Sequence, residues 1–334
     1  MAAGENAHSG ATTTNEPPRK EKTRKTPAGG KETSISRAVH LPVVPPLPCP
    51  PSAKRLHLRH YRIDERTTLP AISTLTAAEA LAVLVPAVRE AGAIGLRFAR
   101  DGAKTFTKAD SSPVTEADLA IDAHLGRVLR AVSPDIGWLS EETADDPERL
   151  SRRQVWIVDP IDGTRGFVAG NGEWVVSAAL VADGRPLVGV LFRPTHGDFY
   201  TAVRGAGAFL NGERLTIAEG GLGDLIAPAG PKTYVEAVRR VAPKAEQRPR
   251  LASLALRLAF LAQNRLDAAF AKANAHDWDL AAADLIVQEA AGRLSGFDGD
   301  ELVYNRPDPV HPPLVAASAS RHEALARALR QAQV

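Results

Sequence analysis

A short hydrophobic run, Val155–Val158, is bounded by polar residues and predicts a buried strand. It is followed by the hexapeptide Asp159–Thr164 (Asp-Pro-Ile-Asp-Gly-Thr). Open α/β sheets bind ligands beyond the carboxyl ends of their strands, and a helix N-terminus there offers N–H groups to an anion. Two aspartates three positions apart also suit a hard cation such as Mg²⁺. The turn therefore predicts a metal and phosphate site, with an ordinary Asp-Gly turn capped by Asp159 as the alternative.

Two helix starts are predicted before this turn. Thr76-Ala-Ala-Glu79 has the pattern of a capping box and should open a helix that continues to about Phe98. Thr115 is expected to cap a second helix, with Asp118 in its first turn and Asp122 on the same face.

Strands and helices are also predicted after the turn. Residues 174–181, 187–192 and 199–203 have the pattern of strands, the first two joined by a hairpin turn at 183–184, while 205–212 predicts turns. Helices are expected over about 251–263 and 278–291, the second ending at Gly292. Because strands and helices alternate, the sequence predicts an α/β protein.

The first 70 residues differ in composition from the rest of the chain. Residues 1–69 contain 12 Lys and Arg against 6 Asp and Glu, whereas the remainder contains 29 against 33. Ten of the 25 prolines also lie in residues 1–70. Such a segment buries too little apolar surface to offset its ordering entropy, so we expect it to be a disordered, solvated tail.

Composition also bears on the cellular compartment. No apolar run reaches the roughly 18 residues of a membrane span, and nothing in the chain is typical of a signal peptide. The single cysteine, Cys49, lies in the tail and excludes an internal disulfide and a cluster of thiolate metal ligands. We therefore expect a cytoplasmic protein that does not bind membranes.

Two further acidic motifs accompany the hexapeptide: Trp138-Leu-Ser-Glu141-Glu142 upstream, and Trp278-Asp279-Leu-Ala-Ala-Ala-Asp284 with Glu289 downstream. In this order the three motifs resemble the inositol monophosphatase superfamily of Mg²⁺-dependent, lithium-sensitive phosphatases over about residues 76–305. The resemblance implies a five-layer α-β-α-β-α sandwich of the inositol monophosphatase and fructose-1,6-bisphosphatase type over residues 71–334. A metal-site half would span about 71–215 and a C-terminal α/β half about 216–334.

A second phosphatase family can be set aside. Asp-Gly-Thr after a strand is also typical of haloacid dehalogenase phosphatases, whose nucleophilic aspartate lies two residues before the second aspartate. In this chain that position is Pro160, which cannot attack phosphorus. A water molecule activated by bound metal remains as the nucleophile.

The resemblance implies a role for each residue of the site. The expected ligands of two or three Mg²⁺ ions are Glu141, Asp159, the carbonyl of Ile161, Asp162, Asp279 and Asp118. Asp159 would bridge two ions, and Asp118 with Glu141 would face a weaker third. Thr164 would orient the attacking water together with Glu141, and the N–H groups of Gly163 and Thr164 would hold the phosphate.

Other polar residues near the motifs are expected to play smaller parts. Glu142 is interpreted as a neighbour of Glu141, and His276 as a core or loop histidine. Charges on helix surfaces are expected at Asp122, Asp284 and Glu289. Tryptophans expected to pack around the site are Trp138, Trp156 and Trp278.

Several strings resemble the 3'(2'),5'-bisphosphate nucleotidase branch of the superfamily, among them Lys108–Asp118 and 253–258. Lys272, seven residues before Asp279, stands where inositol phosphatases carry an acidic residue, and a cation suits a second phosphate. A solvent-facing lysine is the alternative. Gly166 departs from the Asn or Glu that relatives often carry.

The resemblance thus implies hydrolysis of 3'-phosphoadenosine 5'-phosphate, a by-product of sulfate assimilation, to AMP and phosphate. Inositol-1-phosphate is the alternative substrate, and a binding or regulatory protein that has lost the chemistry is the alternative class. The expected partner is a small phosphate ester and not a nucleic acid polymer. The sequence is also compatible with a homodimer.

Overall fold

The computed structural model describes residues 74–109 and 111–333, and all of them belong to one compact unit. The tail predicted over residues 1–70 lies outside the described residues. The division into two halves near residue 215 stays a prediction.

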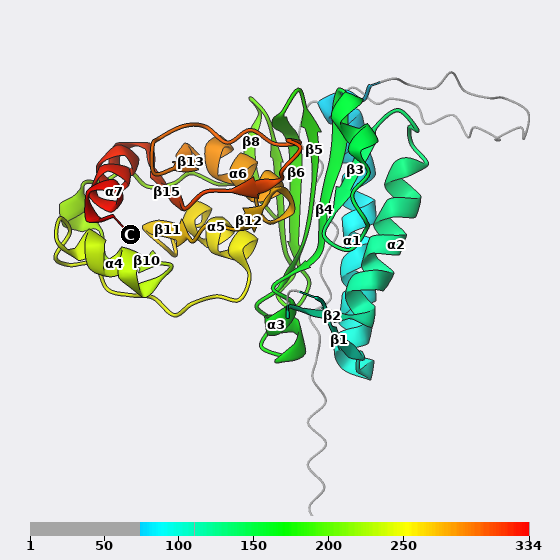
Figure 1. Ribbon diagram of the computed structural model, residues 1–334, viewed down its shortest axis with the longest axis horizontal. Coiled ribbons are helices and arrows are strands. Elements are labelled where there is room, and N and C mark those ends of the chain that lie inside the picture. Colours follow the sequence, from blue (N-terminus) through cyan, green and yellow to red (C-terminus); the bar gives the residue numbers. More distant parts are fainter. Residues whose placement is uncertain (1–73, 110, 334) are drawn as a thin grey trace, which may run out of the picture. The chain divides into compact units, whose positions relative to one another are not determined.

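The largest sheet of the described structure has seven strands and lies between two layers of helices (Figure 1). Its strands, in spatial order, are β3 (Gly137–Ser140), β4 (Gln154–Asp162), β5 (Val175–Ala182), β6 (Arg185–Arg193), β7 (Asp198–Val203), β8 (Gly207–Leu210) and β9 (Glu213–Arg214). β3 and β4 are parallel, and the other neighbours are antiparallel. The strands predicted over 174–181, 187–192 and 199–203 are confirmed. The prediction that residues 205–212 form only turns was wrong. Residues 207–210 form β8 because they pair with β7.

Two long helices cover one face of this sheet, α1 (Ala77–Asp101) and α2 (Glu116–Arg130). Both begin at the predicted N-caps, Thr76 with its capping box and Thr115, which also forms a capping box with Asp118. Their apolar sides pack on the sheet around residues such as Leu84, Ile121 and Trp156, which are all fully buried.

A second pair of helices, α5 (Leu254–Ala262) and α6 (Asp277–Glu289), covers the opposite face. The approach is close: a Cβ on Gly189 of β6 would lie 2.9 Å from the backbone of Ala282 in α6. Glycine therefore allows α6 to lie directly on the sheet.

A smaller sheet covers the far side of α5 and α6, and helices α4 and α7 cover the outside of that sheet. Its strands, in spatial order, are β10 (Pro228–Ala229), β11 (Ala268–Ala271), β15 (Leu314–Ser318) and β13 (Gly292–Gly296). The outer helices are α4 (Lys232–Arg239) and α7 (Ala319–Ala332). The short elements are β1 (Thr105–Thr107), β2 (Pro113–Thr115), η1 (Pro147–Ser151), α3 (Thr164–Val168), η2 (Leu222–Asp224), β12 (Ala275–His276) and β14 (Val310–His311).

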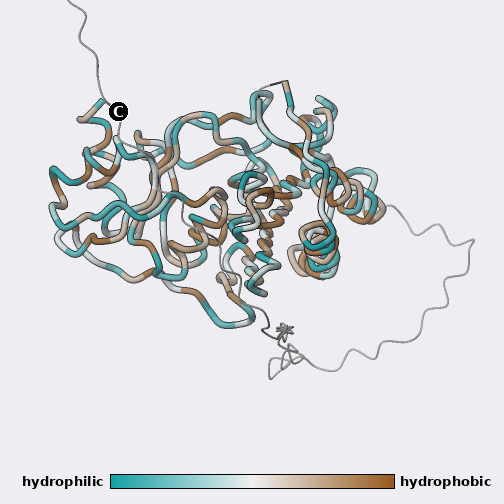
Figure 2. The backbone as a smooth tube through the Cα atoms, turned by 90° about the horizontal axis from the view of Figure 1, so that it is seen from below, coloured by the Kyte–Doolittle hydropathy of each residue, from teal (hydrophilic) through white to brown (hydrophobic). Residues whose placement is uncertain are grey.

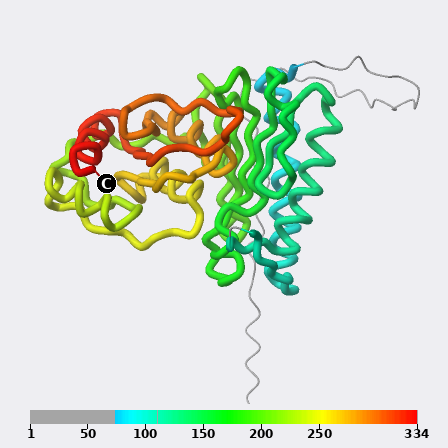
Figure 3. The backbone as a smooth tube through the Cα atoms, viewed as in Figure 1, coloured from blue at the N-terminus to red at the C-terminus, as the bar shows by residue number. Residues whose placement is uncertain are grey.

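The order of layers is therefore α, β, α, β, α, which confirms the five-layer sandwich. Hydrophobic residues concentrate where helices and sheets face one another (Figure 2). The chain builds the layers largely in sequence, since the first two layers come from its earlier residues and the others from its later ones (Figure 3). Among the described residues, no helix combines the length and the apolar character needed to cross a membrane.

The end of α6 differs from the prediction. The helix ends at Glu289, and the left-handed residue that follows is Ala291, with φ 66°. Gly292 instead begins β13, where a Cβ would lie 2.4 Å from Cδ1 of Ile217. Glycine is needed at this position for space and not for its backbone angle.

Candidate metal and phosphate site

Three carboxylates meet where β4 ends and α6 begins. Asp159 and Asp162 come from the end of β4, and Asp279 lies in the first turn of α6. One oxygen from each lies within 4.8 Å of those of the other two. Asp159 is 1% exposed and Asp162 is 6% exposed. The fold thus brings together three of the predicted ligand residues from two distant segments.

The cluster carries unbalanced negative charge. Burial raises the pKa of Asp159 and of Asp279 well above the usual range, and the neighbouring carboxylates raise both further. Burial also raises the pKa of Asp162, to about 6, against the hydrogen bonds that lower it. Oxygen donors that repel one another in this way suit a hard divalent cation. The residues present therefore fit Mg²⁺.

Each carboxylate is oriented by hydrogen bonds from the backbone. Asp162 accepts from Oγ of Ser253 at 2.5 Å and from the N–H of Ala255 at 2.6 Å, so it lies at the N-terminus of α5. Asp159 accepts from the N–H of Ile161 at 3.0 Å, and Asp279 accepts from the N–H of His276 at 2.7 Å.

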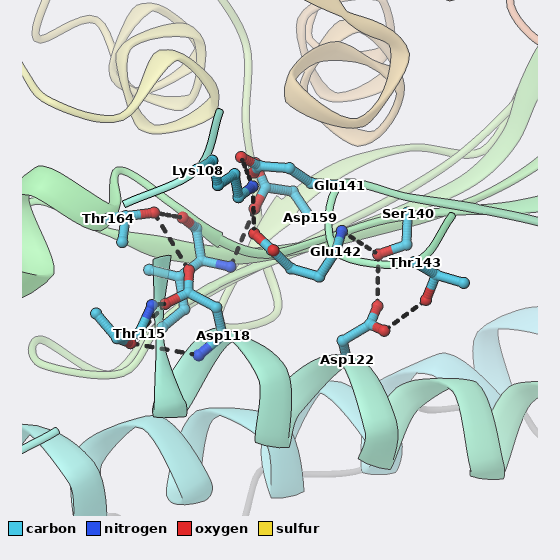
Figure 4. A network of polar contacts seen from close by, with 11 residues as sticks. Lys108, Thr115, Asp118, Asp122, Ser140, Glu141, Glu142, Thr143, Asp159 and Thr164 are labelled. Atoms are coloured by element: carbon cyan, nitrogen blue, oxygen red, sulfur yellow. Dashed lines mark hydrogen bonds and ion pairs between the residues drawn. The ribbon is translucent and has the colours of Figure 1, made fainter. Parts of the chain in front are cut away.

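Glu141 and Glu142 follow the end of β3 and share one lysine (Figure 4). Nζ of Lys108 lies 2.8 Å from Oε1 of Glu141 and 2.7 Å from Oε1 of Glu142. Burial raises the pKa of Glu142 to about 7, although its bond to Lys108 opposes the change. Burial by itself would lower the pKa of Lys108, but its bonds to Glu141 and Glu142 raise it overall. The ammonium group thus neutralises part of the charge beside the cluster, a contact that sequence reasoning missed.

Thr164 and Asp118 lie together on the α2 side of the hexapeptide (Figure 4). Oγ1 of Thr164 is 3.2 Å from Oδ1 of Asp118 and 3.1 Å from the carbonyl oxygen of Ile161. Asp118 is 1% exposed, and its Oδ2 accepts from the N–H of Thr115 at 2.8 Å. Burial raises the pKa of Asp118, and the bonds from Thr115 oppose this. The capping box of α2 therefore holds a carboxylate next to the predicted water-orienting hydroxyl.

The three residues expected as helix-surface charges are not free surface charges. Asp284 is 1% exposed and accepts a hydrogen bond from the hydroxyl of Tyr304 at 2.8 Å, so the prediction was wrong there. The reason is that α6 is buried between two sheets and has little solvent-facing surface. Asp122 accepts from the hydroxyls of Ser140 and Thr143 (Figure 4), and Glu289 accepts the N–H groups of Gly205 and Gly207.

The histidine and tryptophans near the motifs pack against protein groups. His276 stacks on Trp278, with ring centroids 4.5 Å apart, and its side chain is about one third exposed. Trp156 is fully buried between the large sheet and α1 and α2. Trp138 is partly buried and lies under the guanidinium of Arg130.

The carboxylates line a cavity of about 1050 Å³ that is also rich in cationic residues. Six cationic side chains line it: Arg165, Lys232, Arg248, Arg250, Arg257 and Lys272. Gly163 and Thr164 also belong to the lining. Among the described residues, the lining includes no aromatic side chain. The cavity therefore holds negative charge from the carboxylates and positive charge from the six cationic residues, which form its basic wall.

Sequence reasoning found only Lys272 of this basic wall. Of the other five residues, Arg165 lies far from the rest in the chain and four lie between residues 232 and 257, where no periodicity marks them. Arg257 is the least expected, since it is 6% exposed inside an apolar helix. Its guanidinium donates to the carbonyls of Phe270 and Leu251 at 2.8 and 3.2 Å. Burial lowers the pKa of Arg257 to about 10.

The turn after β4 is packed too tightly for side chains at two positions. A Cβ on Gly163, whose φ is +97°, would lie 2.5 Å from the carbonyl oxygen of Glu173. A Cβ on Gly166 would lie 2.6 Å from the same oxygen. The departure noted at Gly166 therefore has a local reason, because residue 173 approaches α3 closely.

Fold and site together define a phosphatase built from five α/β layers around a carboxylate-lined cavity. The chain belongs to the inositol monophosphatase family, whose model, described as "Inositol monophosphatase family", matches residues 76–334.

Relatives and solved structures agree with this membership. The Nus factor SuhB of Haemophilus influenzae is 34% identical over 229 residues, which cover 65% of this chain and 85% of that protein. The 3'(2'),5'-bisphosphate nucleotidase CysQ of Aggregatibacter actinomycetemcomitans is 32% identical over 208 residues, which cover 60% and 77%. The crystal structure of the extragenic suppressor protein suhB from Bartonella henselae superposes with a TM-score of 0.66 at 28% identity, covering 75% of this chain and 98% of that one.

Proposed function

We propose that the protein is a Mg²⁺-dependent phosphomonoesterase that converts 3'-phosphoadenosine 5'-phosphate to AMP and phosphate. The observation that carries the proposal is the single cavity that joins a carboxylate cluster to a basic wall. A substrate that carries one phosphate for metal ions at the cluster and a second phosphate for the cationic residues matches this combination of charges. The similarity to a protein named as a 3'(2'),5'-bisphosphate nucleotidase supports the same substrate class.

The proposed ligands of two Mg²⁺ ions are Glu141, Asp159, Asp162, Asp279 and the carbonyl of Ile161, with Asp118 facing a weaker third ion. Bound ions would neutralise the phosphate and supply an activated water. Little covalent help is needed beyond this, because phosphoryl transfer passes through a loose transition state.

The remaining residues of the site would position the reactants. Thr164, 3.2 Å from the carboxylate of Asp118, would orient the water for in-line attack together with Glu141. The N–H groups of Gly163 and Thr164 would hold the reacting phosphate. Lys272 would bind the second phosphate through a charge-assisted contact.

The test compares Lys272→Ala with Lys244→Ala, a control because Lys244 is exposed and not part of the cavity lining. Loss of a charge-assisted contact of about 1.5 to 3 kcal/mol should lower kcat/KM for 3'-phosphoadenosine 5'-phosphate roughly ten- to hundredfold. The control substitution should leave kcat/KM unchanged. Neither substitution should change kcat/KM for inositol-1-phosphate, which has no second phosphate. Equal small effects of Lys272→Ala on both substrates would show that Lys272 faces the solvent and does not bind the second phosphate.

Two other outcomes would favour the alternatives. A wild-type preference for inositol-1-phosphate would overturn the nucleotidase assignment and leave an inositol-1-monophosphatase. No turnover of either substrate by a protein that binds Mg²⁺ would favour a regulatory role, for which the similarity to proteins named Nus factor SuhB is the supporting observation.

A further inference from the structure

Asp277, two residues before Asp279, is fully buried and takes no part in the reaction proposed above. Its Oδ1 lies 2.7 Å from Nε2 of His311, which is 3% exposed, and its Oδ2 accepts the N–H of Asn305 at 2.7 Å. Its own N–H donates to the carbonyl of Pro309 at 3.0 Å. The first residue of α6 is therefore tied through its side chain and its backbone to the loop that leads into β14.

Asn305 extends this tie to a second element. Its Oδ1 accepts from Nη1 of Arg149 at 2.7 Å, and its Nδ2 donates to the carbonyl of Arg149 at 3.2 Å. The φ of Asn305 is +56°, in the left-handed region that asparagine tolerates better than most residues. Arg149 is 2% exposed, and its remaining nitrogens donate to both carboxylate oxygens of Asp145, at 2.6 and 2.9 Å. Arg149 is thus held from both sides.

Arg149 lies in η1, which packs on β3, the strand that ends just before Glu141. The contact is tight, because a Cβ on Gly137 at the start of β3 would lie 3.1 Å from Cβ of Arg149. Hydrogen bonds therefore join the start of the helix that presents Asp279 to η1, and the packing of η1 on β3 extends this connection to the strand that ends before Glu141.

We propose that Arg149, Asn305, Asp277 and His311 are positioning residues that fix the carboxylate of Asp279 relative to the carboxylates of the large sheet. The proposal rests on the metal site of the proposed function. Hydrogen-bond partners that orient metal ligands change metal affinity by about 10- to 100-fold when they are removed. Loosening the start of α6 should therefore weaken the ion held by Asp279 more than it weakens the fold.

The experiment is a Mn²⁺ titration followed by the electron paramagnetic resonance signal of free Mn²⁺, together with thermal melting without metal. Asp277→Ala removes the tie to His311 and Asn305, while Asp277→Asn keeps an acceptor for the N–H of Asn305. Asn305→Gly keeps the left-handed backbone and removes the bridge to Arg149, without changing charge. The control is His322→Ala, a buried histidine of α7 whose ring lies 3.0 Å from Oγ of Ser295 and far along the chain from the carboxylates.

We expect Asp277→Ala and Asn305→Gly to weaken Mn²⁺ binding at one position about tenfold or more, and Asp277→Asn to restore most of it. His322→Ala should lower the melting temperature and leave Mn²⁺ binding unchanged. Wild-type affinity in Asn305→Gly, or an equal loss in the His322 variant, would overturn the positioning role, even if Asp277→Ala fails to fold. A wild-type protein that binds no Mn²⁺ would instead refute the proposed function itself.

Discussion

Replacing Asp159 by asparagine should stabilise the metal-free protein and remove both its activity and its response to Mg²⁺. Asparagine keeps the shape of the side chain and can still accept the N–H of Ile161, which lies 3.0 Å from Oδ1 of Asp159. What it removes is one of three mutually repelling carboxylates and, in the proposed mechanism, the ligand shared by two ions.

The size of the effect follows from the geometry of the cluster. Two unit charges separated by the 4.8 Å limit of the cluster repel by about 3.5 kcal/mol at an effective dielectric constant of about 20. The gain in stability is smaller than this, because Asp159 is partly protonated in the folded protein. Its pKa is raised well above its usual range by burial and by its neighbours. We therefore expect about 1 to 3 kcal/mol at neutral pH, or about 2 to 12 °C in melting temperature for a domain of this size.

The sign of the pH dependence follows from the raised pKa values. A carboxyl group whose pKa is higher in the folded protein favours folding at low pH and loses that contribution as pH rises through the folded value. The difference between Asp159→Asn and wild type should therefore be small near pH 4. It should grow through pH 6, near which Asp162 also titrates, and then level off.

The assay is thermal melting of both proteins with a chelator and with excess Mg²⁺. A ligand present at about 100 times its Kd stabilises a folded protein by about 2.7 kcal/mol. Excess Mg²⁺ should therefore raise the melting temperature of the wild type and not that of Asp159→Asn. Asp284→Asn is the matched control, since Asp284 is equally buried but bonds to Tyr304 outside the cluster. A variant that is less stable than wild type without metal, or that keeps the full Mg²⁺ response, would refute the reasoning.

Three further predictions concern the surroundings of the cluster. Ser253→Ala should destabilise the protein by about 1 kcal/mol in chemical denaturation, because it removes the N-cap of α5 and a bond to Asp162; an unchanged midpoint would contradict this. Gly166→Ala should destabilise by about 1 to 3 kcal/mol and reduce turnover, since its Cβ would lie 2.6 Å from the carbonyl of Glu173; wild-type melting and kinetics would show that the turn relaxes freely. Deleting residues 1–69 should preserve Mg²⁺-dependent activity, because the family match begins at residue 76; loss of soluble, active protein would show that the tail contributes to the domain.

Local chemistry made part of the structure predictable. The capping box at Thr76, the N-cap at Thr115 and the β-branched run before Asp159 depend on neighbours within a few residues, and the structure confirms each of them. The resemblance carried by the three acidic motifs supplied the layer order, which no local pattern contains. The smaller sheet was not predicted in detail, because strands such as Ala268–Ala271 are short, rich in alanine and buried on both faces, so they show no alternation.

The site was predictable only where its residues cluster in sequence. The approach of Asp159, Asp162 and Asp279 is a tertiary fact that the resemblance implied and the structure displays. Lys108 could not be paired with Glu141 from spacing, because they come from different elements and meet only in the folded chain. Asp284 was misjudged for a related reason, since no local pattern shows that its helix is the one that lies between the two sheets.

Two helix N-termini point at the cluster, yet they cannot balance its charge. Asp162 accepts from the first turn of α5, and Asp279 lies in the first turn of α6. A helix N-terminus stabilises an acidic group by about 0.3 to 1 kcal/mol, rising to about 2 kcal/mol when partly buried. Repulsion within the cluster is larger, at about 3.5 kcal/mol for each charged pair, and it adds to burial in raising the pKa values of Asp159 and Asp279. The fold therefore holds these three residues in an arrangement that only protons or a bound cation can neutralise, and at neutral pH a divalent cation is the more effective of the two.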